Sequence, residues 1–267
     1  MIYAIFIIFG LLPSIIWLLF YLRKDVHPES NKMVLKIFFY GMAAAIIAAI
    51  VEIGASMSLT FLAGPITKTF IYFLFFEFIV IALVEESSKF LIVRQKVINH
   101  SEFDEPLDAM LYMVIVALGF AAFENTLVLF SSLYPSSGII VAGINNIIKD
   151  TILISSLRFL GATFLHALAS GAVGYFLALS FLNSKKRRSL ILKGLGLAAL
   201  LHGLFNISII VIEGGARDQN MPLFFSAVAF LIIFLSVLAL FVSKGFIKLK
   251  KLKSICTNNP NLRIKSE

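Results

Sequence analysis

The sequence predicts an all-α protein, a polytopic transmembrane helix bundle of about seven spans. Of its 267 residues, 60% are hydrophobic and only 14% are charged, whereas soluble domains average about 45–50% apolar and about 25% charged residues. Residues 1–22 contain no charged side chain. Comparable apolar windows recur along the chain, and about 17–25 such residues suffice to cross a bilayer as a helix.

The first window is expected to be a retained span. It is too long for the apolar region of a secretory signal, and it lacks a basic start and a small-residue cleavage site. The expected spans are residues 2–22, 37–61, 69–93, 108–133, 159–182, 191–212 and 221–243.

The distribution of basic residues predicts the orientation. With the N-terminus outside, 19 of the 23 Lys and Arg residues fall in the inner segments 23–36, 89–96, 185–193 and 244–265. Cytoplasmic loops carry such an excess of Lys and Arg. We therefore expect the N-terminus out and the C-terminus in. The net charge of +8 then reflects membrane orientation, and no nucleic-acid partner is expected.

Residues 134–157 are the least regular part of the pattern. Pro135 to Gly138 break the preceding helix, and only Gly138 to Ile144 is cleanly apolar, which is too short to span. If this segment crossed, the basic residues after position 183 would face out, so a surface or re-entrant helix is the preferred interpretation.

We expect one membrane-embedded domain over residues 1–243, with its core in 69–212, followed by a basic cytoplasmic tail over 244–267. The tail is predicted to bind anionic lipid, since each basic side chain contributes about 1 kcal/mol near such a surface. The chain is expected in the cell membrane. Cys256 is the only cysteine, which excludes an intrachain disulfide.

Charged groups inside the expected spans are the main functional signal, because an intramembrane ionisable residue is costly and usually functional. Glu85 and Lys89 are four apart and share a helix face, while Glu86 points about 100° away. One Glu can act as a general base whose charge state Lys89 sets. The alternative is a helix end at which these side chains snorkel to water.

Three further clusters recur in later spans. Glu124, with Asn125 beside it, has only uncharged neighbours from Ala109 to Ile148, and it is either a second carboxylate for water or metal, or a protonated hydrogen-bond donor. His166 lies in the fifth span. His202 and Asn206 are four apart, on one face of the sixth.

Glutamates, histidines and an asparagine on four helices are the parts of a water-activating hydrolytic site. The imidazoles and Asn206 can form an oxyanion hole or hold a metal, or they can make interhelical hydrogen bonds of about 0.6–2 kcal/mol each. Of the other polar groups, Glu52 and Glu77 are isolated in their spans, and Glu77 is an entry-path or structural residue. Arg158 is a counter-ion or interfacial anchor.

In this order, the four clusters resemble those of the PrsW family of intramembrane proteases, which is related to the CAAX prenyl protease and bacteriocin-processing superfamily. The motifs that carry the resemblance are Glu85-Glu86-x-x-Lys89, Phe120-x-x-x-Glu124, His166-Ala167 and His202-x-x-x-Asn206. The resemblance covers about residues 70 to 210.

The resemblance implies an intramembrane endopeptidase that cleaves in or near a membrane segment of a substrate protein, similar to site-1 proteases that act on anti-sigma factors. It implies that Glu85 and Glu86 carry the acid/base chemistry. Glu124, His166, His202 and Asn206 complete the implied site, and Lys89 and Asn125 support it.

The cofactor stays open at this point. No His-Glu-x-x-His zinc motif is present, yet zinc accepts His₂Glu sites, for which the candidates are His166, His202, Glu86 and Glu124. Without metal, a glutamate activates the water. A proton-coupled transporter and a non-catalytic scaffold of the same fold are the alternatives, and the absence of an internal repeat counts against the transporter.

In this layout the first motif lies toward the inner side, while His166 lies near the outer face. We therefore expect tilted spans, or a fifth span that starts earlier. Otherwise His166 is structural.

Overall fold

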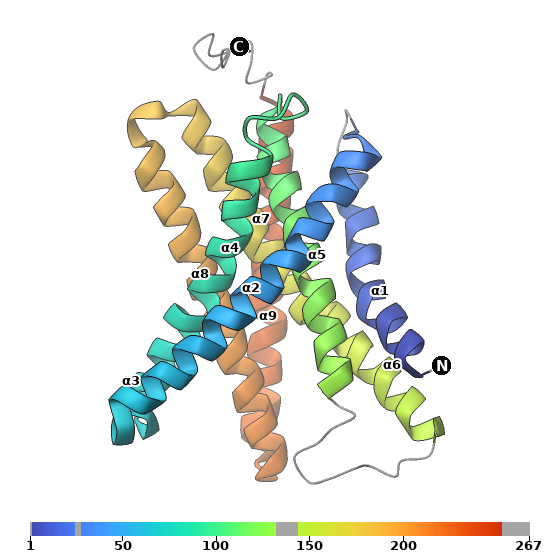
Figure 1. Ribbon diagram of the computed structural model, residues 1–267, viewed down its shortest axis with the longest axis vertical. Coiled ribbons are helices and arrows are strands. Elements are labelled where there is room, and N and C mark those ends of the chain that lie inside the picture. The colour runs from blue at the N-terminus through green and yellow to red at the C-terminus, as the bar shows by residue number, and fades with distance from the viewer. Residues whose placement is uncertain (1, 25–27, 132–143, 253–267) are drawn as a thin grey trace.

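The computed structural model describes residues 2–24, 28–131 and 144–252, and the regular structure in these ranges is entirely helical (Figure 1). The elements are α1 (Ile2–Leu22), α2 (Asn31–Ala63), η1 (Gly64–Lys68), α3 (Phe70–Phe75), η2 (Phe76–Ala82), α4 (Leu83–Lys96), α5 (Pro106–Ser131), α6 (Ile144–Leu160), α7 (Ala162–Leu182), η3 (Ser184–Lys186), α8 (Arg187–Arg217) and α9 (Met221–Lys250). The predicted all-α class is confirmed.

Within the described ranges, six helical segments are long and apolar enough to cross a membrane. They are α1, α2, α5, the α6–α7 pair, α8 and α9. A seventh helical run consists of α3, η2 and α4, which follow one another from Phe70 to Lys96, with a π-helical turn in the middle. The predicted multi-pass architecture is therefore confirmed.

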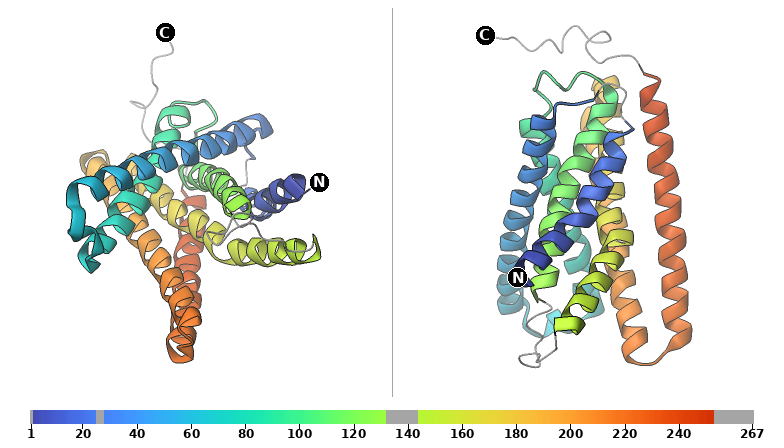
Figure 2. Two further views of the ribbon diagram at one scale, coloured as in Figure 1. Left: turned by 60° about the horizontal axis from the view of Figure 1, so that its bottom comes forward. Right: turned by 90° about the vertical axis from the view of Figure 1, so that its right-hand side faces the viewer.

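Helix α5 is the central element of the bundle. Residues 109–118 are completely buried, and the helix lies in the middle of the others when the molecule is viewed toward one end (Figure 2). The surface of a helix that is apolar all round can face lipid or protein, and the surface of α5 faces protein over most of its length. Helix α5 contacts α1, α2 and α7 extensively, so it positions α7, which carries His166, against its own Glu124.

Glycines allow the closest crossings. A Cβ at Gly119 of α5 would stand 1.9 Å from the carbonyl oxygen of Phe38 in α2, and one at Gly174 of α7 would stand 2.5 Å from the Cα of Met110. Small residues let membrane helices approach in this manner. The backbones of α2, α5 and α7 are therefore in direct contact, which fixes their relative depth.

The fifth span begins earlier than its apolar pattern alone predicts. Helix α6 precedes α7 and is separated from it only by a break at Gly161, and the two form one candidate span over Ile147–Leu182. This resolves the difference in depth, because His166 lies well inside the combined segment. Of the irregular segment 134–157, residues 134–143 lie outside the described ranges, and the rest belongs to helix α6.

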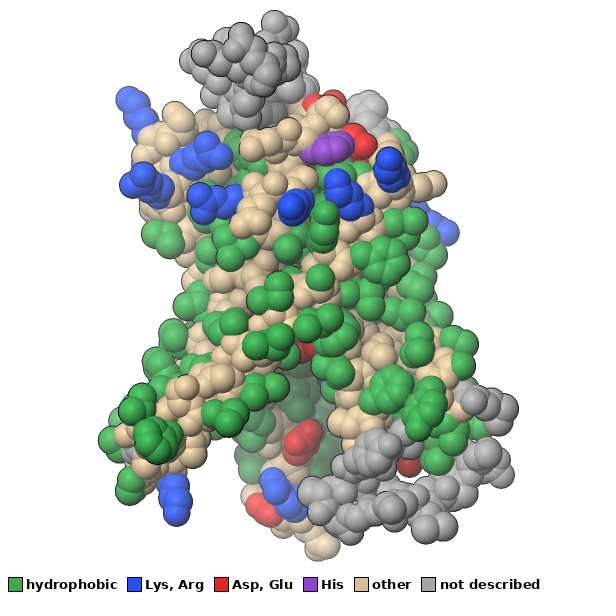
Figure 3. Space-filling view, viewed as in Figure 1, with side chains coloured by type: hydrophobic (Ala, Val, Ile, Leu, Met, Phe, Trp, Pro, Cys, Tyr) green, Lys and Arg blue, Asp and Glu red, His purple; other side chains and the backbone are tan. Residues whose placement is uncertain are grey.

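Most of the basic residues gather at one end of the bundle, the end at which α1 ends and α8 begins (Figure 3). Helix α9 also ends there and runs to Lys250, so the helix extends into the start of the predicted tail. Residues 253–267 of the tail lie outside the described ranges. The first residues of α1 lie toward the opposite end (Figure 1).

Candidate active site

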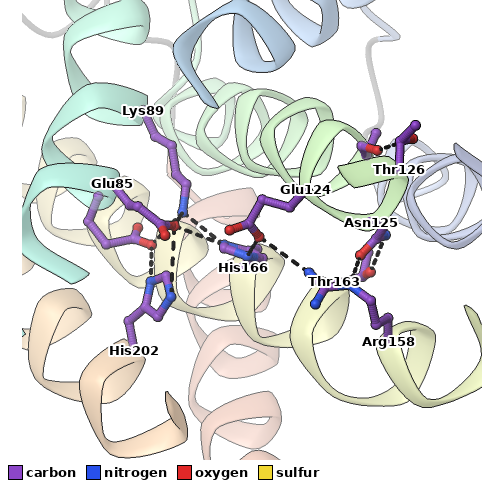
Figure 4. Close-up of polar contacts among 11 residues, drawn as sticks. Glu85, Lys89, Glu124, Asn125, Thr126, Arg158, Thr163, His166 and His202 are labelled. Carbon is purple, nitrogen blue, oxygen red and sulfur yellow. Dashed lines mark hydrogen bonds and ion pairs between the residues drawn. The ribbon is translucent and has the colours of Figure 1, made fainter. Parts of the chain in front are cut away.

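Carboxylates and imidazoles from four helices surround the ammonium group of Lys89 (Figure 4). Lys89 Nζ donates to Glu86 Oε1 at 2.7 Å, to Glu85 Oε2 at 3.3 Å and to His166 Nδ1 at 2.8 Å. An ammonium has three donors, and all three are used. The ring of Phe120, whose centroid lies 4.2 Å from Nζ, covers the cation from another side, as in a cation–π contact.

The local structure of α4 explains this arrangement. Lys89 follows Glu85 by four residues and Glu86 by three, so both carboxylates can reach its side chain on one helix face. The π-helical turn η2 comes directly before α4, and such turns are frequent at functional sites. Phe78 of η2 packs on Gly203 of α8, where a Cβ would stand 2.3 Å from the ring. The first and fourth motifs are therefore held together by direct packing.

The hydrogen bonds of His166 define its tautomer. Because an ammonium can only donate, Nδ1 of His166 must accept the hydrogen bond from Lys89. The proton of the neutral ring is then on Nε2, which donates to Glu124 Oε2 at 2.7 Å. Glu124 thus orients His166 so that Nδ1 faces Lys89 and Glu85.

His202 is oriented in the same way by Glu86. Its Nδ1 donates to Glu86 Oε1 at 3.0 Å, and Nε2 lies 3.8 Å from Glu85 Oε2. The other oxygen of Glu86 accepts from Ser170 Oγ at 2.8 Å. Glu86 is completely buried, and each of its oxygens has a donor. It is therefore held as a fixed anion, with Ser170 as a partner that the motifs did not indicate.

Glu124 connects the cluster to α6. Arg158 Nη2 lies 3.4 Å from Glu124 Oε2, and Arg158 Nε donates to Asn125 Oδ1. Asn125 Nδ2 in turn donates to Thr163 Oγ1 at 2.9 Å. Arg158 is thus the counter-ion of Glu124, which is one of the two roles predicted for it. Asn125 does not contact the histidines itself, and it holds the guanidinium of Arg158 in place.

Asn206 lies apart from this network. Its Nδ2 donates to Glu77 Oε2 at 3.2 Å, although it is one turn from His202 on the same helix face. Glu77, expected to be an isolated residue on an entry path or a structural hydrogen bonder, therefore has a hydrogen-bond partner on α8. The pair extends the polar region from the Glu85 cluster toward η2.

Eight site residues were predicted, and the structure joins six of them in one continuous polar network. A seventh is attached to the network through Arg158, and the eighth lies beside the network, hydrogen-bonded to Glu77. In that order these residues are Glu85, Glu86, Lys89, Glu124, His166, His202, Asn125 and Asn206. Sequence reasoning missed Ser170 and Thr163. Both lie within one turn of His166, and this spacing was the available signal.

Exposure of the cluster is greatest on the side of Glu124 and Arg158. The side chains of Glu86 and Lys89 have no exposed surface, and that of Glu85 is 5% exposed. By contrast, Glu124 and Arg158 are 28% and 20% exposed. This exposure favours an approach of the substrate from the side of Glu124.

A divalent metal fits the donor atoms in type and number. Ligand atoms of Glu85, His166 and His202 all lie within 4.8 Å of one another, and two imidazoles with one carboxylate form a zinc site in several peptidases. Each imidazole also donates a hydrogen bond from the N–H of its second nitrogen to a carboxylate, His166 to Glu124 and His202 to Glu86, as zinc-binding histidines usually do. This set differs from the expected candidates, because Glu86 and Glu124 orient the histidines while Glu85 joins the donors.

Lys89 competes with such an ion. Its ammonium contacts two of the three metal-binding candidates, Glu85 and His166, so a cation there requires Lys89 to withdraw from Nδ1. With both imidazoles neutral, three carboxylates face the two cations Lys89 and Arg158. The cluster then carries one net negative charge, which favours the binding of a proton or a cation.

Comparisons with known proteins point to one family. A family model described as "PrsW family intramembrane metalloprotease" matches residues 29–240. The Protease PrsW of Geobacillus kaustophilus is 28% identical over 199 residues, which cover 74% of this chain and 76% of that protein. The protein of the same name from Halalkalibacterium halodurans is 27% identical over 188 residues, covering 70% and 74%.

A third relative, Protease PrsW of Clostridioides difficile, is 30% identical over 140 residues, or 52% of this chain and 53% of that protein. No solved structure is matched by the chain. The relatives are peptidases by name, which favours a membrane-embedded peptidase over the transporter and scaffold alternatives.

Proposed function

This chain belongs to the PrsW family of intramembrane metalloproteases, and we propose that it is an endopeptidase that hydrolyses a peptide bond in or beside a membrane segment of a substrate protein. The observation that carries the proposal is the buried Glu85–Glu86–Lys89 group, which two oriented histidines complete. A single-span membrane protein is the substrate class, and an anti-sigma factor is the example that the family resemblance suggests. The proposed location is the cell membrane.

Glu85 is the proposed general base. Among the placed residues, every polar contact of Glu85 falls on Oε2, which leaves Oε1 to accept a hydrogen bond from water. Glu85 takes a proton from this water as its oxygen attacks the scissile carbonyl carbon. General-base catalysis of this kind contributes about 10²- to 10⁴-fold.

Glu86 and Lys89 hold this base in place. Lys89 donates to both carboxylates, and its cation favours the ionised form of Glu85, which burial alone would disfavour. Glu86 fixes the ring of His202, so that Nε2 faces Glu85. Neither Glu86 nor Lys89 has exposed surface, so both are proposed to position the reacting groups.

The oxyanion of the tetrahedral intermediate requires hydrogen-bond donors. The amide group of Asn206 has two hydrogens. One is bonded to Glu77, and we assign the other to the oxyanion. A donor of this type contributes about 10²- to 10³-fold to the rate. Glu85 then returns its proton to the leaving nitrogen as the carbon–nitrogen bond breaks, which yields a carboxylic acid and an amine.

Zinc, if bound, would be held by Glu85, His166 and His202. When bound, it supplies polarisation of the scissile carbonyl and acidification of a water molecule. Glu86 and Glu124 keep the two imidazoles in the tautomers that either route needs.

The basic end is proposed to contact anionic lipid. Helix α9 carries Lys244, Lys248 and Lys250 in its last turns, and the remaining basic residues of the tail follow. We propose the domain organisation that the sequence predicts, which is one membrane-embedded domain followed by this basic tail.

The direct test uses Glu85→Gln and Glu86→Gln, which keep the size of the side chain and remove its charge. Purified variants are mixed in detergent with a panel of tagged single-span reporter proteins, and cleavage is followed by gel. We expect wild-type cleavage, and a loss of about 10²-fold or more in each variant.

The control is Glu213→Gln, which removes an exposed carboxylate from α8 and should cleave at the wild-type rate. Thermal unfolding of each variant separates lost catalysis from lost structure. Undiminished cleavage by both folded site variants would overturn the assignment.

A further inference from the structure

The second half of α2 leaves the bundle. In its first half, Ala44, Ala45 and Ala48 are buried, whereas none of residues 49–62 is. Nothing lies within 4 Å of the position that a Cβ would take at Gly54. In Figure 1, α2 and α5 cross and then diverge toward opposite sides, and the surface is hollowed between their ends (Figure 3). We call this hollow the wedge between α2 and α5.

The narrow end of the wedge is apolar. Ala44, Ala45 and Ala48 of α2 pack against Phe120 of α5, and Phe123 packs on this group. The helices separate beyond these contacts, so the cluster is the apex of the wedge.

A carboxylate follows the apex on each wall. Glu52 lies one turn after Ala48, and Glu124 lies one turn after Phe120, so each continues the face of its helix that forms the apex. Glu52 is close enough to Glu124, Lys89 and Glu77 for its charge to interact with theirs. The wedge therefore leads directly to the accessible side of the candidate active site.

Glu52 has an unused acceptor. Its Oε1 is buried, and it has no hydrogen-bond partner within the described ranges. An unsatisfied buried polar atom is expensive. Its persistence beside a reaction centre, on the half of α2 that leaves the bundle, indicates a partner that arrives with the substrate.

We propose that the wedge between α2 and α5 admits an unwound segment of the substrate, and that Glu52 Oε1 accepts a hydrogen bond from a backbone N–H of that segment. This deepens the proposed function and rests on it. An internal peptide bond can be attacked only after its helix opens, and a backbone N–H freed inside lipid needs an acceptor. The apolar walls suit the flanking side chains.

The kinetic test uses Glu52→Ala and Glu52→Gln with a reporter that the wild type cleaves. A hydrogen bond to a charged group changes affinity by about 10- to 100-fold. We expect KM to rise by that factor in Glu52→Ala with kcat nearly unchanged, a smaller rise in Glu52→Gln, and none in Glu213→Gln. A lower kcat at constant KM, or wild-type constants in both variants, would overturn the proposal.

A binding test does not require turnover. A photo-reactive residue replaces Ser56, which is half-buried one turn beyond Glu52, or Met57, which is 71% exposed on the neighbouring face. Both are made in a Glu86→Gln background. The probe is a peptide of about 20 leucine and alanine residues with a central Gly-Gly pair, because glycine weakens a helix.

We expect adduct formation at position 56 at least fivefold above that at position 57, and competition by excess unlabelled peptide. Equal labelling, or labelling at 57 alone, would overturn the proposed route. Because the probe is not cleaved, labelling at 56 without peptidase activity in the wild type would fault the proposed function and leave the wedge intact.

Discussion

The contact between Phe78 and Gly203 gives the sharpest prediction about how the site is assembled. In Gly203→Ala, the new methyl group would stand 2.3 Å from Cδ1 and 2.5 Å from Cε1 of Phe78. Carbon atoms rest about 3.5 Å apart, so the ring and the helix must separate by about 1.2 Å. Overpacking of this size costs about 1–3 kcal/mol of unfolding free energy.

The displacement reaches both halves of the site. Gly203 follows His202, and the carbonyl of Phe78 accepts a hydrogen bond from the N–H of Leu83 at the start of α4, two residues before Glu85. A misplacement of about 1 Å can reduce the rate about 10²-fold. We therefore expect kcat/KM for a reporter protein to fall by about that factor in Gly203→Ala.

The assay pairs reporter cleavage with thermal unfolding in detergent. The control is Gly196→Ala on the same helix, where a Cβ meets nothing within 4 Å and neither readout should fall. Phe78→Leu removes part of the ring and should restore most of the activity when combined with Gly203→Ala. Full activity in Gly203→Ala, or no rescue by the second substitution, would refute this account of the η2–α8 packing.

Two further predictions concern the binding of zinc and the stability of the protein at low pH. Lys89→Met removes the ammonium beside His166 Nδ1. Zinc content after incubation and desalting should therefore rise above that of the wild type, and zinc should raise the melting temperature; unchanged zinc content would speak against competition. At the basic end, although burial acts in the opposite direction, hydrogen bonds from the side chain and backbone N–H of Ser30 hold the pKa of Glu102 below its ordinary value. The resulting stability is present above the ordinary Glu pKa and lost as the pH falls through the lowered one. Ser30→Ala also removes the N-cap of α2, at about 0.5–2 kcal/mol, so its melting temperature should be lower at pH 7 and fall less steeply below about pH 4. Parallel acid profiles would contradict this.

Much of the architecture follows from the sequence because lipid imposes simple constraints. Apolar length sets the spans, and the predicted first, fourth and seventh spans correspond closely to α1, α5 and α9. The third span was harder to describe, because it contains the π-helical turn η2, where Phe78 packs against Gly203 of a separate helix. No local pattern contains that information.

The candidate site was partly predictable for a similar reason. Charged residues stand out against apolar spans, so Glu85, Glu124 and His202 could be found from the sequence. The hydrogen-bond partner of each residue could not be predicted, since hydrogen bonds between helices depend on the rotation and depth of each helix. Asn206 pairs with Glu77, and Glu86 pairs with Ser170, because α8 and α7 present those faces to their neighbours.

The burial of Lys89 has a practical consequence for handling the protein. Its amine is enclosed by carboxylates, an imidazole and the ring of Phe120, so acylating reagents that attack free amines cannot reach it in the folded state. The lysines at the basic end, such as Lys185 and Lys193, are exposed. Amine coupling to a solid support should therefore anchor most molecules by that end, with Lys68 and Lys149 as exposed sites at the other end, and leave the reaction centre chemically untouched.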